Sequence, residues 1–390
     1  MANNSFICVD LGASNTRYSV DDGIMHWMPN NVAIIKQDEN TRMEVWDSNN
    51  LDERINQHLD VTIEKTSGES SYFPLRALVG KIADRYTSVS DKPTGMENKH
   101  TQRITYINAI VATAVSRLAT GDKGDKMNEV YMYLALPPVE ASRASDYVNK
   151  ELCGEYKVTF NMLGEYVKLH IKSVKCMEES LAAITTFFFS DGKPTDKVSK
   201  YGNGYVLSID IGASTTDLVA VQNMRYLERT GKTIKIGGNV VRDYVIDDIM
   251  SQDNIDLNLD SAEAAVAEGR VQTGMSYIDC SEIVSNAKSM FAEQIVNNMQ
   301  TYFKQIGIPI QSFMAIVVSG GGSMPGGYID NDGISHKTSE SMAYFITEKL
   351  KGVCSTIAVE YIDDNPRLAN IKGLFNRAIF DKAKRERNNQ

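Results

Sequence analysis

Two aspartates stand at the ends of apolar segments whose surroundings are nearly identical. Asp10 lies within FICVDLGASNTRYSV, residues 6–20, and Asp210 lies within VLSIDIGASTTDLVAV, residues 206–221. Each aspartate is followed by one apolar residue and then by Gly, Ala and Ser. An apolar run is typical of a buried strand, and small polar residues are typical of a tight turn. The sequence therefore predicts the same strand–turn–strand hairpin twice.

The chemistry of such a hairpin pair suits a polyphosphate. A carboxylate at the end of a buried strand is costly unless it is paired, and two of them facing one gap suit Mg²⁺, often through water. Turns of small residues present backbone N–H groups and short hydroxyls to anionic oxygens. We therefore expect Asp10 and Asp210 near the metal and the two turns at the phosphates. The turn residues are Gly12, Ala13, Ser14, Asn15 and Thr16 in the first hairpin and Gly212, Ala213, Ser214 and Thr215 in the second.

The alternative is a chance pair of β-hairpins. It is disfavoured because each copy opens one half of the chain. A P-loop is excluded because Gly-x-x-x-x-Gly-Lys-[Ser/Thr] does not occur in the sequence.

Two glycine-rich segments extend this interpretation from a polyphosphate to a nucleotide. SGGGSMPGG follows an apolar run, and its glycines would let the backbone approach a base or a ribose. IGGN offers a helix N-terminus to the nucleotide. Taken alone, the first segment fits a flexible surface loop equally well, and the second fits a simple helix entry. The candidate residues are Gly320, Gly321, Gly322, Ser323 and Met324 in the first segment and Gly237 and Gly238 in the second.

Two adjacent carboxylates, Glu178 and Glu179, lie in CMEESLAA between the two hairpins. The sequence predicts a junction there between a strand and a helix. One glutamate would orient a water molecule, and the other would place a favourable negative charge in the first helical turn.

Composition limits the class of protein. The chain has 390 residues, 42% apolar and 23% charged, which predicts two or more soluble globular domains. No apolar run is long enough for a membrane span, and MANNSF lacks the features of a signal peptide, so we expect a cytoplasmic protein without membrane attachment. Five scattered cysteines indicate reduced thiols, and five histidines show no metal-ligand spacing. A net charge of −9 argues against direct binding to nucleic acid.

The remaining pattern predicts alternating strands and helices in both halves. Residues 105–119 place apolar side chains on one helical face, and residues 281–307 have the strongest helical periodicity in the chain. The polar segment 190–204 contains Gly and Pro and is predicted to be a linker at a domain boundary. Further strands are predicted at 130–138, 157–160, 166–172 and the start of 313–327, and further helices within 174–189, after IGGN and at the C-terminus.

Taken together, these segments resemble those of the actin-fold ATPases, which include actin, the seventy-kilodalton heat-shock chaperones and the sugar kinases. The matching segments, in the order of that family, are VDLGASNTR, MEESLAA, IDIGASTTD, VVSGGGSMPGG and DNPRLANIKG. The resemblance implies an α/β fold of two duplicated actin/ribonuclease-H-like domains with a nucleotide cleft between them, which holds ATP and Mg²⁺. It places domain I at 1–190, with a variable small subdomain at about 30–100 and a C-terminal helix of about 360–390 that returns to it. Domain II is then 191–359, with a small subdomain at about 232–290.

Within that family, the chain is most similar to the ParM-like actins that segregate bacterial plasmids. VKCMEESLAA resembles their connecting segment, which implies that Glu179 orients the attacking water and acts in catalysis with Asp10 and Asp210 at Mg²⁺. Arg17 stands where the family often has a lysine near the phosphates. The resemblance further implies filaments formed by self-association, hydrolysis of ATP or GTP, and a ParR-like DNA-binding adaptor on centromere-like plasmid DNA.

Other functions of the same fold remain open at this stage. A small-molecule kinase needs a carboxylate base aimed at a substrate hydroxyl and a sugar pocket, and we find no recognisable sugar-binding signature. A chaperone-like switch would need a peptide-binding domain that the chain has no room for. A cell-shape actin would need a membrane anchor, for which the polar N-terminus offers no amphipathic segment, although an internal loop could serve. A phage or chromosomal filament protein with another cargo fits the same motifs.

Overall fold

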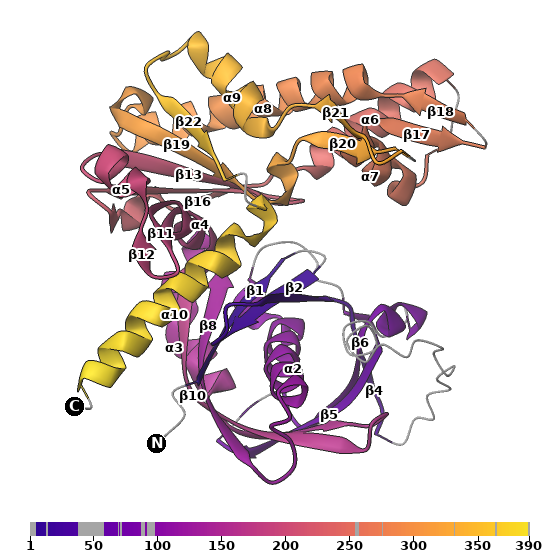
Figure 1. Ribbon diagram of the computed structural model, residues 1–390, viewed down its shortest axis with the longest axis vertical. Helices are drawn as coiled ribbons and strands as arrows, with labels where there is room; N and C mark the ends of the chain where they lie inside the picture. The colour runs from indigo at the N-terminus through magenta and orange to yellow at the C-terminus, as the bar shows by residue number, and fades with distance from the viewer. Residues whose placement is uncertain are drawn as a thin grey trace. The chain divides into compact units, whose positions relative to one another are not determined.

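The computed structural model describes residues 5–12, 15–37, 58–68, 70, 72–86, 90–91, 98–253, 257–274, 276–330, 332–362 and 365–388. The chain divides into two compact units, and Figure 1 labels their helices and strands. Unit 1 comprises Met1–Lys193 and Asn370–Gln390, and unit 2 comprises Pro194–Ala369.

Unit 1 contains a ten-stranded sheet. Its strand β8 pairs in parallel with β1 and β10, and the other described pairs are antiparallel. The strands in sheet order are β3 (Met25–Pro29), β2 (Asn15–Val20), β1 (Ser5–Leu11), β8 (Met127–Leu136), β10 (Glu165–Glu178), β9 (Gly154–Phe160), β5 (His58–Ser67), β6 (Leu75–Gly80), β4 (Val32–Ile35) and β7 (Ser90–Asp91).

This sheet curls around the helix α2, Arg103–Ala119 (Figure 1). The chain passes from β3 to β4 through Asn30 and Asn31 alone, although β3 is first and β4 ninth in the sheet order. A flat sheet would hold these strands about 38 Å apart, whereas a two-residue link spans about 11 Å. The short link therefore requires the curl.

Helix α2 is buried on every side from Ile104 to Leu118. The predicted helix is confirmed, and its apolar face is buried together with the opposite face because the curled sheet surrounds the helix. Small polar side chains tolerate this burial because they bond to the helix backbone. Thr113 Oγ1 donates to the carbonyl of Ala109 at 2.7 Å, and Ser116 Oγ donates to the carbonyl of Thr113 at 2.7 Å.

Among the described residues, unit 1 also contains the helices α3 (Pro138–Leu152), which packs against β10, and α4 (Glu179–Phe188). It contains α10 (Ala369–Asn388) as well, except for Ala369. The segment predicted to be a linker, 190–204, is more ordered than expected. It contains strand β12 (Lys193–Pro194), which pairs with β11 (Phe189–Ser190), and the helix α5 (Asp196–Tyr201).

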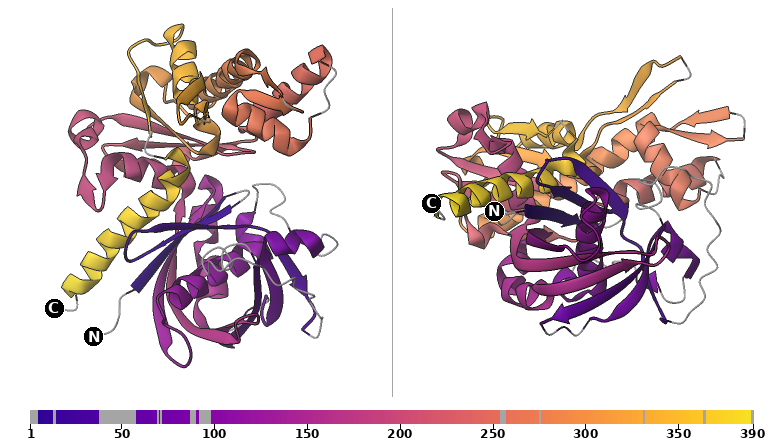
Figure 2. Two further views of the ribbon diagram at one scale, coloured as in Figure 1. Left: turned by 45° about the vertical axis from the view of Figure 1, so that its right-hand side comes forward. Right: turned by 60° about the horizontal axis from the view of Figure 1, so that its bottom comes forward.

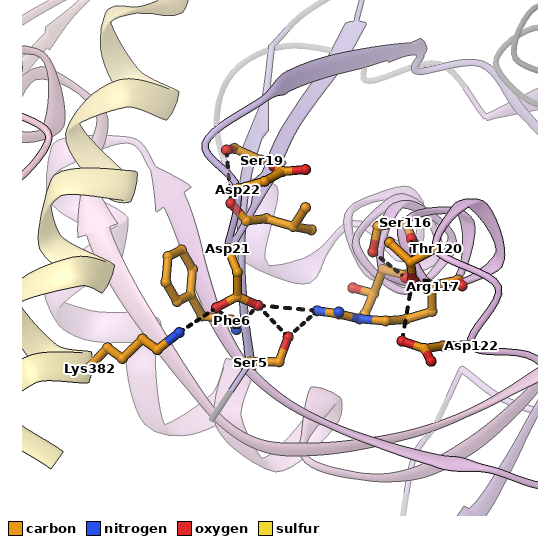
Figure 3. Close-up of polar contacts among 12 residues, drawn as sticks. Ser5, Phe6, Ser19, Asp21, Asp22, Ser116, Arg117, Thr120, Asp122 and Lys382 are labelled. Carbon is orange, nitrogen blue, oxygen red and sulfur yellow. Dashed lines mark hydrogen bonds and ion pairs between the residues drawn. The ribbon is translucent and has the colours of Figure 1, made fainter. Parts of the chain in front are cut away.

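The C-terminal helix α10 is fixed to unit 1 by a polar cluster around Asp21 (Figure 3). Lys382 Nζ of α10 donates to Asp21 Oδ1 at 3.1 Å, and Ser5 Oγ donates to Asp21 Oδ2 at 2.5 Å. The backbone N–H of Phe6 donates to the same carboxylate at 3.2 Å. The buried Arg117 of α2 donates to Ser5 Oγ and lies 4.0 Å from Asp21 Oδ2. One carboxylate thus joins α10, β1 and α2.

Unit 2 contains a smaller mixed sheet, in which β13 and β22 flank β19 in parallel. Its helices are α5, α6 (Asn239–Asp253), α7 (Leu259–Glu268), α8 (Ser281–Gln305) and α9 (Met342–Lys351). The strands in sheet order are β15 (Arg225–Tyr226), β14 (Thr216–Gln222), β13 (Tyr205–Ile211), β19 (Phe313–Ser319) and β22 (Ala358–Tyr361), with β16 (Lys232–Ile234) also paired with β14.

Two further hairpins belong to unit 2, β17–β18 (Arg270–Thr273 and Ser276–Asp279) and β20–β21 (Gly326–Ile329 and Ser335–Ser339). Both project from the unit in Figure 2. Their strands contact each other through Arg270, whose guanidinium lies 3.4 Å from the ring centroid of Tyr328.

The two units repeat one strand order, β2-β1-β8-β10 in unit 1 and β14-β13-β19-β22 in unit 2. In each, an antiparallel hairpin is followed by two parallel strands. The prediction of a duplicated α/β fold is therefore confirmed.

Candidate functional site

The two predicted hairpins have matching geometry. Asp10 pairs with Arg17 across β1 and β2, and Asp210 pairs with Asp217 across β13 and β14. In each turn, one glycine N–H closes the loop. Gly12 donates to the carbonyl of Asn15 at 3.0 Å, and Gly212 donates to the carbonyl of Thr215 at 2.9 Å. The repeated sequence thus forms a repeated turn.

The carboxylate of the first hairpin is buried and paired. Asp10 is 2% exposed, and Arg17 Nη1 lies 3.3 Å from its Oδ2. This ion pair satisfies the aspartate and holds the guanidinium beside the turn. A Cβ on Gly12 would lie 3.1 Å from Arg17 Nη1, so glycine leaves room for that contact. The predicted site residues Ala13 and Ser14 lie outside the described residues.

The second hairpin has a different charge pattern. Asp210 is buried and accepts a hydrogen bond from Ser319 Oγ at 3.1 Å. Its cross-strand neighbour Asp217 is also buried and accepts from Thr233 Oγ1 at 2.5 Å. Cross-strand neighbours point to the same face of a sheet, so the second hairpin presents two carboxylates where the first presents a carboxylate and a guanidinium.

The glycines of IGGN pack directly on the turn of the second hairpin. Gly238 N–H donates to the carbonyl of Gly212 at 2.9 Å, and Asn239 N–H donates to the carbonyl of Ala213 at 2.8 Å. A Cβ on Gly237 would lie 2.6 Å from the carbonyl oxygen of Ala213, too close for any side chain. Glycine is therefore required where the start of α6 meets the turn.

The glycines of SGGGSMPGG reach the same turn from the end of β19. Gly320 has φ 89°, and a Cβ on it would lie 2.5 Å from Asp210 Oδ1. A Cβ on Gly322 would lie 2.9 Å from the carbonyl oxygen of Gly212. Two glycine-rich segments far apart in sequence thus meet at one turn of unit 2, with backbone against backbone. The predicted residues Gly212, Ala213, Thr215, Gly237, Gly238, Gly320 and Gly322 are brought together, and the exposed Ser214 lies within 3.4 Å of Asn239 Nδ2.

Two predicted hydroxyls are used within the protein. Thr16 is fully buried and donates to Asn30 Oδ1, and Ser323 is fully buried and donates to the carbonyl of Gly320 at 2.7 Å. Each hydroxyl therefore stabilises its own loop, and a role for Thr16 and Ser323 at a ligand stays a prediction. Gly321 remains exposed, with the side chain of Arg367 next to it.

Lys288 of α8 supports the last glycine-rich segment, and sequence reasoning missed it. Its Nζ donates to the carbonyl of Met324 at 2.9 Å, to Ser339 Oγ at 2.8 Å and to the carbonyl of Glu340 at 3.2 Å. Burial lowers the pKa of Lys288 to about 8, although the charge of Glu340 acts in the opposite direction. The burial of Lys288 could have been predicted from the sequence, because this residue lies among the apolar residues on one face of a strongly periodic helix.

Glu178 and Glu179 lie at the predicted junction between a strand and a helix. Glu178 ends β10 and Glu179 begins α4, and both are buried, at 4% and 6% exposure. Neither is therefore a solvated charge in the first helical turn. Glu179 Oε1 lies 2.5 Å from Lys99 Nζ, which also donates to the carbonyl of Leu11 at 2.8 Å. Lys99 thus connects the candidate water-orienting carboxylate to the end of β1.

Lys99 could not be identified from the sequence, because it lies in a polar stretch without periodicity. It opens the short helix η2, Lys99–Thr101, whose position is fixed by the buried Glu140 of α3. The carboxylate of Glu140 accepts from the backbone N–H groups of Asn98 and His100 and lies 2.9 Å from His100 Nδ1.

The predicted site residues thus form two groups, one in each unit. Asp10, Arg17 and Glu179 belong to unit 1, whereas Asp210 and the glycine-rich segments belong to unit 2. Their union around one ligand stays a prediction. Within the described residues, no three His, Cys, Asp or Glu side chains gather into a group that could hold a metal ion, so binding of Mg²⁺ also stays a prediction.

The chain is similar to known proteins in part of its sequence and in its fold. Residues 208–326 match the family model described as archaeal actin homologue MreB-like, C-terminal. The actin-like protein Alp7A is 17% identical, with a TM-score of 0.74 over 98% of each chain. The archaeal actin homologue Ta0583 in complex with ADP is 14% identical, with a TM-score of 0.63 over 96% of this chain and 99% of that one.

A ParM protein from a 15-stranded filament of Clostridium botulinum is 18% identical, with a TM-score of 0.63 over 97% of this chain and 99% of that one. No curated protein sequence matches the chain. The chain has the two-domain actin fold, as the motifs indicated. Among the helices of the described residues, none has the length and apolar character of a membrane span.

Proposed function

We propose that the protein is a nucleotide-dependent, filament-forming ATPase of the actin type. The observation that carries the proposal is the duplicated hairpin, whose turn in unit 2 is enclosed by the backbone of two glycine-rich segments. Such an arrangement presents N–H groups and little side-chain bulk, which suits phosphate and ribose oxygens. The contacts that exclude a Cβ at Gly237 and Gly320 fit a site in which backbone must come close.

In this proposal, the two units bind one nucleotide together. The turns that begin at Gly12 and Gly212 hold the phosphates, and Asp10 and Asp210 hold Mg²⁺ through water. Gly237, Gly238 and the segment from Gly320 to Met324 hold the nucleoside. ATP is the expected nucleotide, and GTP is an alternative because backbone contacts discriminate poorly between bases. Bound Mg²⁺ would supply charge that stabilises the transferred phosphoryl group.

Glu179 is the proposed water-orienting residue. A positioned carboxylate holds the attacking water in line with the terminal phosphate. Lys99 holds this carboxylate at one oxygen, so the pair fixes the orientation of Glu179 before any substrate binds. Water-directed chemistry favours a hydrolase over a kinase, which would need a base aimed at a substrate hydroxyl.

Filament formation is supported by the similarity to ParM of the Clostridium botulinum filament. We propose that filaments of this protein move plasmid DNA through a ParR-like adaptor, because the net charge of −9 disfavours direct binding to DNA. A phage or cell-shape filament is the alternative within the same fold. The expected location is the cytoplasm.

One experiment separates these functions. The purified protein is mixed with Mg²⁺ and either ATP or GTP, and assembly is followed by light scattering and electron microscopy. We expect filaments with a nucleoside triphosphate and none with buffer alone. Flat scattering at tens of micromolar protein, together with phosphate transfer to a small-molecule hydroxyl, would establish the kinase alternative.

The adaptor is tested separately, with duplex DNA and the purified protein. We expect no tight binding to bare DNA at physiological salt. Tight and salt-sensitive binding would contradict the need for an adaptor, because it would mean that the chain itself recognises the phosphate backbone.

A further inference from the structure

We propose that Asn30 is a positioning residue that holds Gly12 and Thr16, the two ends of the turn in the first hairpin, for binding of phosphate, an inference that rests on the proposed nucleotide function. Asn30 lies in the link between β3 and β4 and is 1% exposed. Its Nδ2 donates to the carbonyl of Gly12, and its Oδ1 accepts from Thr16 Oγ1. These two residues stand on either side of the turn, so a single side-chain amide ties both of its ends.

The orientation of this amide follows from chemistry. The carbonyl of Gly12 can only accept a hydrogen bond, so the NH₂ group of Asn30 must face it. The oxygen of the amide then faces Thr16, whose hydroxyl donates. Both functions of the amide are therefore used, whereas an ionised carboxylate of the same size would provide acceptors only.

Unit 2 makes the same two bonds with backbone groups in the place of the Asn30 amide. The carbonyl of Gly212 accepts from the backbone N–H of Gly238 at 2.9 Å, and Thr216 Oγ1 donates to the backbone carbonyl of Ile236 at 2.8 Å. The amide of Asn30 thus takes the place of the backbone of IGGN. Because both hairpins require the same pair of bonds, the pair belongs to the geometry of the turn and is not an accident of local packing.

Asn30 is itself anchored in the core. Its backbone carbonyl accepts from Asn108 Nδ2 at 3.2 Å, and Asn108 is a 1% exposed residue of the enclosed helix α2. Asn30 also belongs to the two-residue link that requires the curl of the sheet. The turn is therefore attached to the most buried helix of unit 1.

This attachment has a consequence for ligand binding. The N–H of Gly12 is engaged by the carbonyl of Asn15, and the carbonyl of Gly12 is engaged by Asn30. The entry to the turn is thus ordered before an anion arrives, so ligand binding does not bear the entropic cost of ordering it. Loss of the Asn30 amide should therefore reduce the free energy of nucleotide binding more than it reduces the free energy of unfolding.

The test is Asn30→Asp, which keeps the size and the acceptor for Thr16 but removes the donor to Gly12. At about pH 8, we expect the affinity for a fluorescent ATP analogue with Mg²⁺ to fall about tenfold, because an ionised carboxylate faces the carbonyl of Gly12. At about pH 5.5, a protonated carboxyl group can donate to that carbonyl, so the affinity should return toward that of the wild type. Equal binding by variant and wild type at pH 8, or a loss that is the same at both pH values, overturns the inference.

Wild-type protein is measured at both pH values, because Asp10 and Arg17 of the hairpin, and Asp84, which accepts from Asn31 Nδ2 at 2.8 Å, also lie near this position. If the wild type binds no nucleotide at either pH, the proposed function fails and not the role of Asn30. Thermal unfolding without nucleotide reports the structural cost separately.

A second pair of variants keeps the inference testable if Asn30→Asp does not fold. Thr16→Val removes the hydroxyl that orients the amide, and Thr113→Val removes an equally buried hydroxyl that bonds only within α2. We expect Thr16→Val to bind the analogue several-fold more weakly than Thr113→Val. Equal affinities in these two variants would overturn the proposal.

Discussion

Lys99 Nζ lies 2.5 Å from Glu179 Oε1, and the two side chains are 5% and 8% exposed. A buried carboxylate this close to a buried ammonium forms a charge-assisted hydrogen bond. The same ammonium donates to the carbonyl of Leu11, next to the turn of the first hairpin. The candidate catalytic carboxylate and the candidate phosphate turn are thereby joined through one lysine.

The first prediction concerns Glu179 itself. Glu179→Gln keeps the shape of the side chain but cannot orient water as a carboxylate does, so hydrolysis should slow by about 10² to 10⁴. Nucleotide binding and assembly should persist, and filaments should last longer. Phosphate release measured beside light scattering checks this.

The control for that experiment is Glu151→Gln, in a buried glutamate of α3 with 6% exposure. Glu178 is unsuitable as a control because it directly precedes Glu179, at the end of β10. Fast phosphate release by Glu179→Gln would remove Glu179 from the mechanism.

The second prediction concerns Lys99. Lys99→Met should destabilise the protein by about 3 kcal/mol, because it leaves the carboxylate of Glu179 buried without its ammonium. Burial then favours the protonated acid, so hydrolysis by the variant should be slow near neutral pH and should rise with pH. Urea unfolding and a pH profile of phosphate release measure the two effects.

The double variant Lys99→Met/Glu179→Gln provides the decisive comparison. Removing both partners leaves no unpaired charge, so its stability should exceed that of Lys99→Met while its hydrolysis stays low. A double variant that is less stable than Lys99→Met would show that the two residues are not coupled.

The third prediction concerns the paired aspartates. Asp10→Asn and Asp210→Asn should each weaken binding of the Mg²⁺ nucleotide more than about tenfold, since each removes a negative charge from the proposed cation site. Asp125→Asn is the control, because that carboxylate is 83% exposed and pairs with Lys168. Titration with a fluorescent nucleotide measures all three, and unchanged affinity in both hairpin variants would refute the site.

The hairpins, the long helix α8 and the strand-to-helix junction at Glu179 could be predicted from the sequence, because each depends on a local pattern. Lys99 and Asn30 could not. Lys99 is 80 residues from Glu179, and Asn30 is 18 residues from Gly12, and both belong to segments without periodicity. The curl of the sheet was equally hidden, because it depends on the pairing of β4 with β6 and not on the residues of the link. Local sequence patterns predict helices and strands, whereas contacts between residues far apart in sequence can be found only from the three-dimensional structure.

The fourth prediction concerns the cluster that fixes α10. Asp21→Asn should lower the free energy of unfolding by about 2 kcal/mol, because the buried Arg117 and the amine of Lys382 lose their shared carboxylate. Asp22→Asn should change stability little, because the hydrogen bond that the carboxylate of Asp22 accepts from the backbone N–H of Ile24, at 2.9 Å, is exposed. Urea unfolding of both variants is the measurement, and equal midpoints would contradict the role given to Asp21.

The last prediction concerns pH and Lys288. Its pKa is about 8 in the folded protein and has the ordinary value of 10.5 in the unfolded chain. Below about pH 8, Lys288 is protonated in both the folded protein and the unfolded chain, and burial of its charge lowers the free energy of unfolding. Between about pH 8 and pH 10.5, the unfolded chain retains the proton that the folded protein has lost, so stability from this group rises with pH, by about 3 kcal/mol in total.

Lys288→Met removes this dependence along with the bonds to Met324, Ser339 and Glu340. The difference in unfolding free energy, wild type minus variant, should therefore increase between about pH 7 and pH 9.5. The subtraction cancels the other groups that titrate in this range. A difference that stays constant would mean that Lys288 titrates as an exposed lysine does, and a difference that decreases would mean that the folded state holds the proton more tightly than the unfolded chain. Nucleotide affinity measured in parallel should fall in the variant, because the carbonyl of Met324 loses the donor that holds the glycine-rich segment in place.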